Sequence, residues 1–207
     1  MTQSRLDAVY GATSRDQLAN AYDGWAESYD ADMGEVGYRH PAIALGLLTR
    51  YLPAGANPIL DAGAGTGLVG ELPGTMGYPV VDALDASTGM LAIAQSKGVY
   101  RELHQAFLGD PLPFGDDQFE AAVSTGVFTA GHVGAEGLPE LFRIVRPGGL
   151  LVLSVKVTVW ESGVAAFLEQ SASDGQITIV ETTPPYESMP AGEERSPCVG
   201  LVCRVLR

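Results

Sequence analysis

A run of closely spaced glycines follows an aspartate in residues 59–70, which read ILDAGAGTGLVG. The glycines are Gly63, Gly65, Gly67 and Gly70. Glycine lets the backbone approach a ligand closely and adopt positive φ values that other residues avoid. Counted from Gly65, the run matches G-x-G-x-x-G, the pattern of dinucleotide-binding loops. Counted from Asp61, it matches D-x-G-x-G-x-G, which indicates a different ligand and a different chemistry.

A second acidic position, Asp85, comes 20 residues after Gly65 and ends the apolar run YPVVDALD. In an open parallel sheet, ligands bind beyond the carboxyl ends of the strands, where a carboxylate can accept both hydroxyls of a ribose. This spacing suits the dinucleotide interpretation as well. The charge of Asp61 disfavours it, because that charge would oppose a pyrophosphate and would suit a cationic amino group. S-adenosylmethionine (SAM), which carries an ammonium, a sulfonium and an adenosine, is a ligand of that kind.

Strand and helix patterns alternate along the rest of the chain and must position these residues. Helices are predicted over 14–30, 40–52, 87–98, 136–146 and 160–170, with a further helix beginning in 68–72. Strands are predicted over 59–62, 78–85, 100–108, 119–127, 148–157, 176–183 and 197–206. The alternation predicts a mostly parallel sheet covered on both faces. Only a loop, residues 184–196, is expected between the last two strands, which should therefore pair antiparallel.

Four segments in order, LDAGAGTG, DASTGML, GDPLPFGDDQFE and LPELFRIVRPGGLLVLSV, resemble the class I SAM-dependent methyltransferases over nearly the whole chain. With YDGWAESYD, YRHP and GHV, the chain most resembles the methyltransferase-like proteins of the Williams–Beuren region type. The resemblance implies an α/β, Rossmann-like fold with a seven-stranded sheet in the order 3-2-1-4-5-7-6 and helices on both faces. It implies one domain over 1–207, with a helical flap on the substrate side in 1–52 and a SAM-binding core in 53–207.

The same resemblance implies a cofactor site along the strand ends. The glycine loop would line the methionine half of SAM, and the acid after the second strand would hold the ribose. The residues carried over are Asp61, Gly63, Gly65 and Gly67 for the methionine half, Asp85, Ala86, Met90 and Asp110 for the adenosine half, and Ser124 and Thr125 beside the sulfonium and the substrate.

An aromatic stripe follows Ser14, which forms a capping-box pattern with Gln17. The stripe consists of Leu18, Tyr22, Trp25 and Tyr29. Core packing is the usual role of such a stripe, but the family places this segment as a flap. We therefore expect Leu18 and Trp25 to pack, and Tyr22 or Tyr29 to contact SAM, since a phenol attracts a sulfonium.

Three further positions have alternative interpretations. Arg39 is either a solvated surface residue or the partner of the methionine carboxylate of SAM. His132 follows the strand over 119–127 and is either a general base facing the substrate or a loop histidine with no such role. His40 and His104 are expected to be structural. No metal-ligand spacing occurs among the three histidines and two cysteines, so no metal site is predicted.

Charge and composition restrict the partners. The chain has 207 residues and a formal net charge of −13, with 12 scattered Lys and Arg residues against 25 Asp and Glu residues. Nucleic-acid binding needs clustered basic residues, so no nucleic-acid partner is expected. No run of about 18 apolar residues spans a membrane, and the N-terminus lacks an apolar signal core. We expect a cytoplasmic protein that acts as a monomer or homodimer.

These observations predict methyl transfer from SAM to N, O or S of a small-molecule acceptor, with release of S-adenosylhomocysteine. Positioning and exclusion of water can supply most of the catalysis, and a base is needed only if the acceptor must lose a proton. Two alternatives remain. One is a SAM-binding protein without transfer activity, and the other is an NAD-dependent dehydrogenase.

Overall fold

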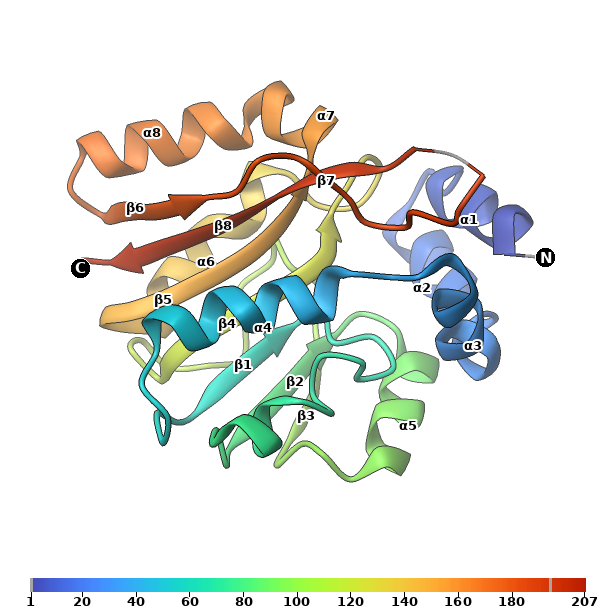
Figure 1. Ribbon diagram of the computed structural model, residues 1–207, viewed down its shortest axis with the longest axis horizontal. Coiled ribbons are helices and arrows are strands. Elements are labelled where there is room, and N and C mark those ends of the chain that lie inside the picture. The colour runs from blue at the N-terminus through green and yellow to red at the C-terminus, as the bar shows by residue number, and fades with distance from the viewer. Residues whose placement is uncertain (1, 194) are drawn as a thin grey trace.

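One twisted sheet forms the centre of the computed structural model, which describes residues 2–193 and 195–207 (Figure 1). Its strands are β1 (Ile59–Ala62), β2 (Val81–Asp85), β3 (Leu103–Gln105), β4 (Phe119–Phe128), β5 (Val145–Lys156), β6 (Ile177–Thr182), β7 (Tyr186–Glu187) and β8 (Pro197–Val205). The strand order is β3-β2-β1-β4-β5-β8-β6. Strands β1 to β5 pair in parallel, while β8 runs antiparallel to both β5 and β6. The two-residue strand β7 lies off this path, and without it β8 is the seventh strand along the chain. The observed order therefore confirms the predicted order 3-2-1-4-5-7-6.

The short strand β7 corrects one prediction. Residues 184–196 were expected to form only a loop, but Tyr186 pairs with Cys198 and Glu187 with Pro197. These two residues extend the β8 edge beyond the end of β6. Polar groups of this loop are thereby satisfied by backbone pairing.

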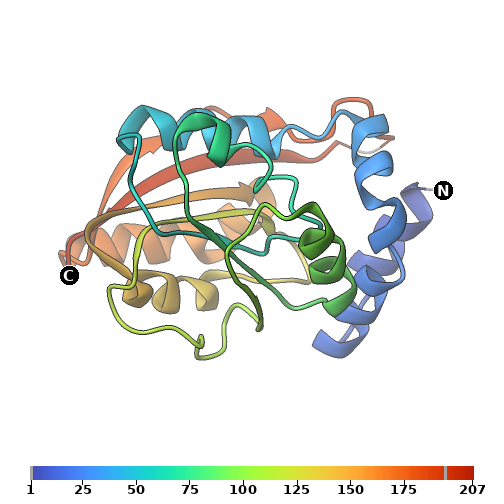
Figure 2. The same cartoon turned by 90° about the horizontal axis from the view of Figure 1, so that it is seen from below.

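Helices cover both faces of the sheet and one of its ends (Figure 2). They are α1 (Thr2–Tyr10), α2 (Arg15–Asp23), α3 (Ala26–Val36), α4 (His40–Tyr51), α5 (Thr88–Lys97), α6 (Leu138–Ile144), α7 (Val157–Val159) and α8 (Ala165–Ser173). Helices α6 and α8 lie on one face, α4 lies on the other, and α1 to α3 stand beyond the carboxyl ends of the parallel strands. Within the described part of the chain, no helix is long and apolar enough to cross a membrane.

The apolar run in β5 shows why this strand must lie in the middle of the molecule. Leu151 and Leu153 pack in the core cluster beneath α6 and α8. Leu150 and Val152 point to the other face and pack against α4. Because successive side chains alternate between faces, a strand covered on both sides is apolar at every position.

The helix predicted over 14–30 is broken in the structure. Ser14 caps α2 by accepting the N–H of Gln17 at 3.2 Å, while the Gln17 side chain accepts from the N–H of Thr13 at 2.9 Å. Helix α2 ends at Asp23 with Gly24 as its C-cap, and α3 begins at Ala26. The break divides the aromatic stripe between two helices, which allows its members to face different neighbours.

The prediction that a helix begins in residues 68–72 is wrong. These residues form turns, and a single 3₁₀ turn, Pro73–Met76, follows them. Proline has no N–H to donate inside a helix. In addition, the N–H of Gly70 donates to the hydroxyl of Tyr100 at 3.2 Å, which ties this segment to the floor of the glycine loop.

Candidate cofactor and acceptor site

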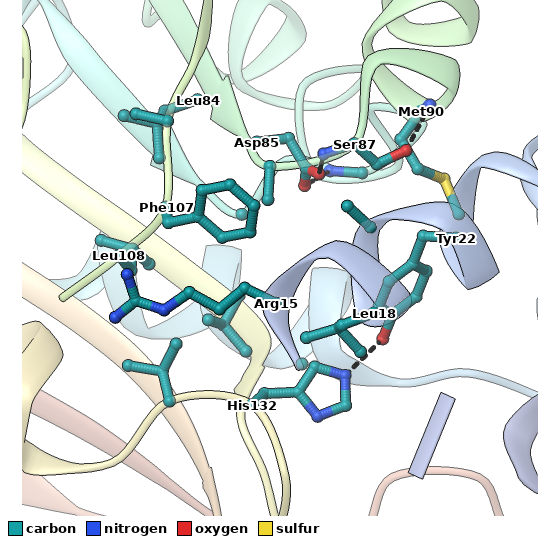
Figure 3. Close-up of a pocket in the computed structure, with 18 of the residues that line it drawn as sticks. Arg15, Leu18, Tyr22, Leu84, Asp85, Ser87, Met90, Phe107, Leu108 and His132 are labelled. Atoms are coloured by element: carbon teal, nitrogen blue, oxygen red, sulfur yellow. Dashed lines mark hydrogen bonds between the residues drawn. The ribbon is translucent and has the colours of Figure 1, made fainter. Parts of the chain in front are cut away.

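A cleft with about 820 Å³ of empty space, partly open to solvent, lies at the carboxyl ends of the strands. Its walls come from α2, the glycine loop, the end of β2, the start of α5 and the segments that follow β3 and β4 (Figure 3).

The structure brings together most of the residues that the sequence predicted. Those that line the cleft are Tyr22, Tyr29, Gly63, Gly65, Asp85, Ala86, Met90, Thr125 and His132. Five others lie outside its lining: Arg39, Asp61, Gly67, Asp110 and Ser124.

Asp85 joins the two strand ends at the centre of the cleft. Its Oδ2 accepts the N–H of Gly65 at 2.8 Å, and its Oδ1 accepts the N–H of Ser87 at 2.8 Å. Burial raises the pKa of Asp85, and these backbone donors oppose the rise. A carboxylate has about four acceptor positions, so Asp85 keeps acceptor capacity for a hydroxyl of a ribose.

Asp61, Gly67 and Ser124 form the floor beneath the cleft rather than its wall. Asp61 is buried, and its Oδ2 accepts the hydroxyl of Tyr100 at 2.6 Å, while its Oδ1 has no hydrogen-bond partner. Burial raises the pKa of Asp61 to about 7. A Cβ at Gly67 would lie 3.0 Å from the ring of Tyr100. The Ser124 hydroxyl donates to the carbonyl of Ala62 at 2.6 Å, which joins β4 to β1.

Asp110 and Arg39 are not among the residues that line the cleft. Asp110 forms a salt bridge with Arg15 at 2.6 Å, and both side chains are about half exposed at the mouth of the cleft. The guanidinium of Arg15 lies 5.8 Å from the centre of the Phe107 ring. Arg39 is exposed at the start of α4, and its backbone N–H donates to the carbonyl of Ser188.

Several residues that line the cleft had no predicted role there, among them Arg15, Leu18 and Phe107. Leu18 packs in the N-terminal core cluster, as expected, and also faces the cleft. Phe107 lay inside the strand predicted over 100–108, but β3 ends at Gln105. Its place directly after a parallel strand is the signal that could have identified it.

The N-terminal helices are fastened to the core on both sides of the cleft. At the end of α2, Asp23 accepts the hydroxyl of Ser87 at 2.5 Å and the N–H of Gly89 at 2.8 Å. On α3, Asp30 accepts the hydroxyl of Thr66 in the glycine loop and pairs with Lys97 at 2.6 Å. Helices α2 and α3 therefore roof the cleft.

Tyr22 and His132 meet across the cleft (Figure 3). The Tyr22 hydroxyl lies 2.9 Å from Nε2 of His132. The other ring nitrogen, Nδ1, lies 2.9 Å from the hydroxyl of Thr129 and 3.2 Å from the carbonyl of Ala130. Burial lowers the pKa of His132 and raises that of Tyr22 well above its usual value, so both groups are uncharged at neutral pH.

A second group of rings, Tyr38, His40 and Tyr186, packs together near Tyr29. Tyr38 hydrogen-bonds with Tyr29, and His40 Nδ1 lies 2.7 Å from the hydroxyl of Tyr186. Burial lowers the pKa of His40 to about 4. A Cβ at Gly126 would lie 2.5 Å from the Tyr38 hydroxyl. His40 is therefore buried and neutral, as expected of a residue with a structural role.

Residues 60–153, from β1 to the middle of β5, match the methyltransferase domain family. The chain belongs to the class I SAM-dependent methyltransferases. It is 36% identical over 157 residues to Methyltransferase-like protein 27 of Homo sapiens. The aligned region covers 74% of this chain and 64% of that protein. It is 30% identical over 161 residues to a malonyl-[acyl-carrier protein] O-methyltransferase of Serratia marcescens. That alignment covers 72% of this chain and 56% of the relative. The chain therefore spans less than two thirds of the length of these relatives.

The fold of this methyltransferase is shared with solved structures. One is the complex between the Haloferax volcanii Trm112 methyltransferase activator and a methyltransferase. The TM-score is 0.67 and the sequence identity is 18%, and the superposition covers 90% of this chain and 98% of that chain. The cofactor of the family is SAM, which sets aside the dehydrogenase alternative.

The residues of the cleft fit SAM. A Cβ at Gly65, where φ is +54°, would meet no protein atom within 4 Å, because it would enter the cleft itself. Asp85 offers acceptor positions at the place where a ribose would lie. The unpartnered Oδ1 of Asp61 adds a buried acceptor below the glycine loop, which an ammonium group could satisfy.

Proposed function

We propose that this methyltransferase transfers the methyl group of SAM to N, O or S of a small-molecule acceptor. Gly63 and Gly65 would line the methionine half, and Thr125 would lie beside the sulfonium and the acceptor. Asp85 would hold the ribose, and Ala86 and Met90 would flank the adenine. When bound, SAM supplies a methyl group that its sulfonium has already activated.

The roof over the cleft is the observation that carries this proposal. Helices α2 and α3 close the space above the strand ends, and Asp23 and Asp30 hold them there. A roof of this kind excludes water and encloses an acceptor that fits inside the cleft. It also favours transfer over a role as a SAM-binding protein without activity, since enclosure of the donor serves chemistry more than binding.

Charge supports a small acceptor over a nucleic acid. The chain carries a net charge of −13. Eight of its 12 basic residues form ion pairs with acidic side chains in the described residues: Arg5, Arg15, Arg50, Lys97, Arg101, Arg143, Arg146 and Arg195. Paired cations contribute little to a phosphate-binding surface.

Two measurements test the proposal. Calorimetric titration with SAM, S-adenosylhomocysteine and NAD should show binding of the first two and none of NAD. Methyl-labelled SAM should then be incubated separately with a small-metabolite extract, RNA, DNA and protein. Label in the metabolite fraction supports the proposal, and label confined to RNA, DNA or protein contradicts it.

A further inference from the structure

The hydrogen bonds around His132 define which of its nitrogens carries the proton. Nδ1 faces two oxygens: the hydroxyl of Thr129 at 2.9 Å, which can accept or donate, and the carbonyl of Ala130 at 3.2 Å, which can only accept. A hydrogen on Nδ1 suits both oxygens, whereas a lone pair there would face the lone pairs of the carbonyl, so the geometry favours the neutral ring with its hydrogen on Nδ1. The lone pair on Nε2 is then free to accept the hydroxyl proton of Tyr22 at 2.9 Å. In this arrangement the Tyr22 hydroxyl on α2 is the donor and Nε2 of His132 is the acceptor.

The surroundings of the pair favour a neutral imidazole. Lys156 lies 4.7 Å from the centre of the Tyr10 ring, which packs edge-on against His132 at 5.9 Å. The positive charge of Lys156 adds to burial in lowering the pKa of His132. The titratable and charged groups that face the pair are Tyr10 from α1, Lys156 from β5, Tyr29 from α3 and Asp85 from β2. A ring that is neutral at rest is able to take up one proton.

We propose that Tyr22 and His132 form a proton relay, and that the acceptor is therefore a protic group: a hydroxyl, a thiol or an amine. This inference rests on the proposed function. As the acceptor atom bonds to the methyl carbon, the carbon–sulfur bond of SAM breaks and its electron pair stays on sulfur. The acceptor proton passes to the oxygen of Tyr22, and the hydroxyl proton of Tyr22 passes to Nε2 of His132. The resulting imidazolium donates its Nδ1–H to Ala130 and later releases one proton to water.

The relay gives the two residues different parts. Tyr22 contacts the acceptor and is the catalytic residue. His132 acts through Tyr22 and is the positioning residue that accepts the final proton. A carboxylate acceptor is already ionised at neutral pH and has no proton to pass on. The pair therefore distinguishes protic acceptors from carboxylates.

Nitrogen-15 NMR of histidine-labelled protein with S-adenosylhomocysteine bound tests the relay without knowledge of the acceptor. His132→Gln identifies the His132 signals by their loss. We expect the neutral Nδ1–H form at pH 7, and a rise in the pKa of His132 in Tyr22→Phe, because that variant loses a bond that stabilises the neutral ring. The Nε2–H form, or a charged ring at pH 7, would overturn the relay. Failure to bind SAM or its product would instead count against the proposed function.

Transfer of label into the metabolite extract tests the consequence. His132→Gln can accept the Tyr22 hydroxyl through its amide oxygen but cannot take up a proton. We expect this variant and Tyr22→Phe to lose transfer by about 100-fold or more. The SAM affinity of His132→Gln should stay within about threefold of the parent. Tyr51→Phe and His104→Asn, which change a phenol and an imidazole outside the cleft, should retain transfer. Full transfer by His132→Gln would overturn the relay.

The pH profile and the stability of the product complete the test. Transfer should fall as pH drops through the pKa of His132, because the protonated ring cannot accept a proton, and this inflection should vanish in His132→Gln. Methyl esters release methanol in mild alkali, whereas methyl ethers, thioethers and amines do not. Label that resists alkali supports a protic acceptor, and label released as methanol contradicts it.

Discussion

Oδ2 of Asp85 accepts the backbone N–H of Gly65 at 2.8 Å, so the acid after β2 holds the glycine loop after β1 in place. The two motifs that the sequence singled out are thus one unit. Their spacing of 20 residues carries the chain out of one strand, through a short connection and back along the next. The hydrogen bond presets the loop before a ligand arrives.

Substitution Asp85→Ala removes both this support and the proposed ribose contacts. Hydrogen bonds to a charged group contribute roughly 1.5–3 kcal/mol, so the SAM affinity should fall about tenfold or more. Calorimetry measures the affinity, and Glu169→Ala, an exposed acid on α8, is the matched control. SAM affinity equal to that of the parent would refute the role of Asp85.

Substitution Gly65→Val should abolish SAM binding while the protein stays folded. The branched side chain would occupy the cleft, and a φ of +54° is unfavourable for valine. Circular dichroism reports the fold and calorimetry the binding. Gly46→Val, at an exposed glycine of α4 with open space around its Cβ, is the control that should bind normally. Normal binding by Gly65→Val would mean that the loop is only a tight turn.

The roof should respond to ligand. Hydrogen exchange over residues 14–32 should slow when S-adenosylhomocysteine is added, because a bound ligand contacts Tyr22 and Tyr29 from below. Exchange in α4 should change little, which provides an internal control. Asp23→Ala removes the acceptor of Ser87 and Gly89 and should speed exchange in α2 without ligand. Identical exchange with and without ligand would support simple core packing of this segment.

Asp61 should make the ligand-free protein less stable as pH rises. Its pKa is raised to about 7 in the folded state by burial, against a usual value of 3.8. Between these values the folded state binds more protons than the unfolded state, so the free energy of unfolding falls as pH increases. Asp61→Asn keeps an acceptor for Tyr100 and removes the charge.

The melting temperature measured from pH 4 to pH 8 checks this prediction. The parent should lose stability relative to Asp61→Asn across that range, by on the order of 2–4 kcal/mol at pH 8. Parallel curves for the two proteins would show that Asp61 is not protonated in the folded state.

The sheet and the cofactor loop follow from patterns that are local in the sequence. The run of apolar residues in β5 and the glycines after Asp61 each act within a few residues, so their outcome can be predicted from spacing alone. The order of strands follows from the family resemblance, and the structure confirms it. Gly24 ends α2 and Pro73 begins the 3₁₀ turn, and both residues are visible in the sequence. Whether a glycine or a proline ends a helix depends on the segments that pack around it. The split of the first helix and the loss of the helix at 68–72 were therefore missed.

Only the tertiary structure decided which side chains meet. Asp110 pairs with Arg15 across 95 residues, and Tyr22 meets His132 across 110 residues. Asp61 and Ser124 stand at the predicted strand ends, yet they point to the floor, where Tyr100 and Ala62 satisfy them. The direction of a side chain at a strand end depends on the pleat and on what packs beside it. Spacing along the chain can place a residue at the site, but the packing of distant segments determines what it touches.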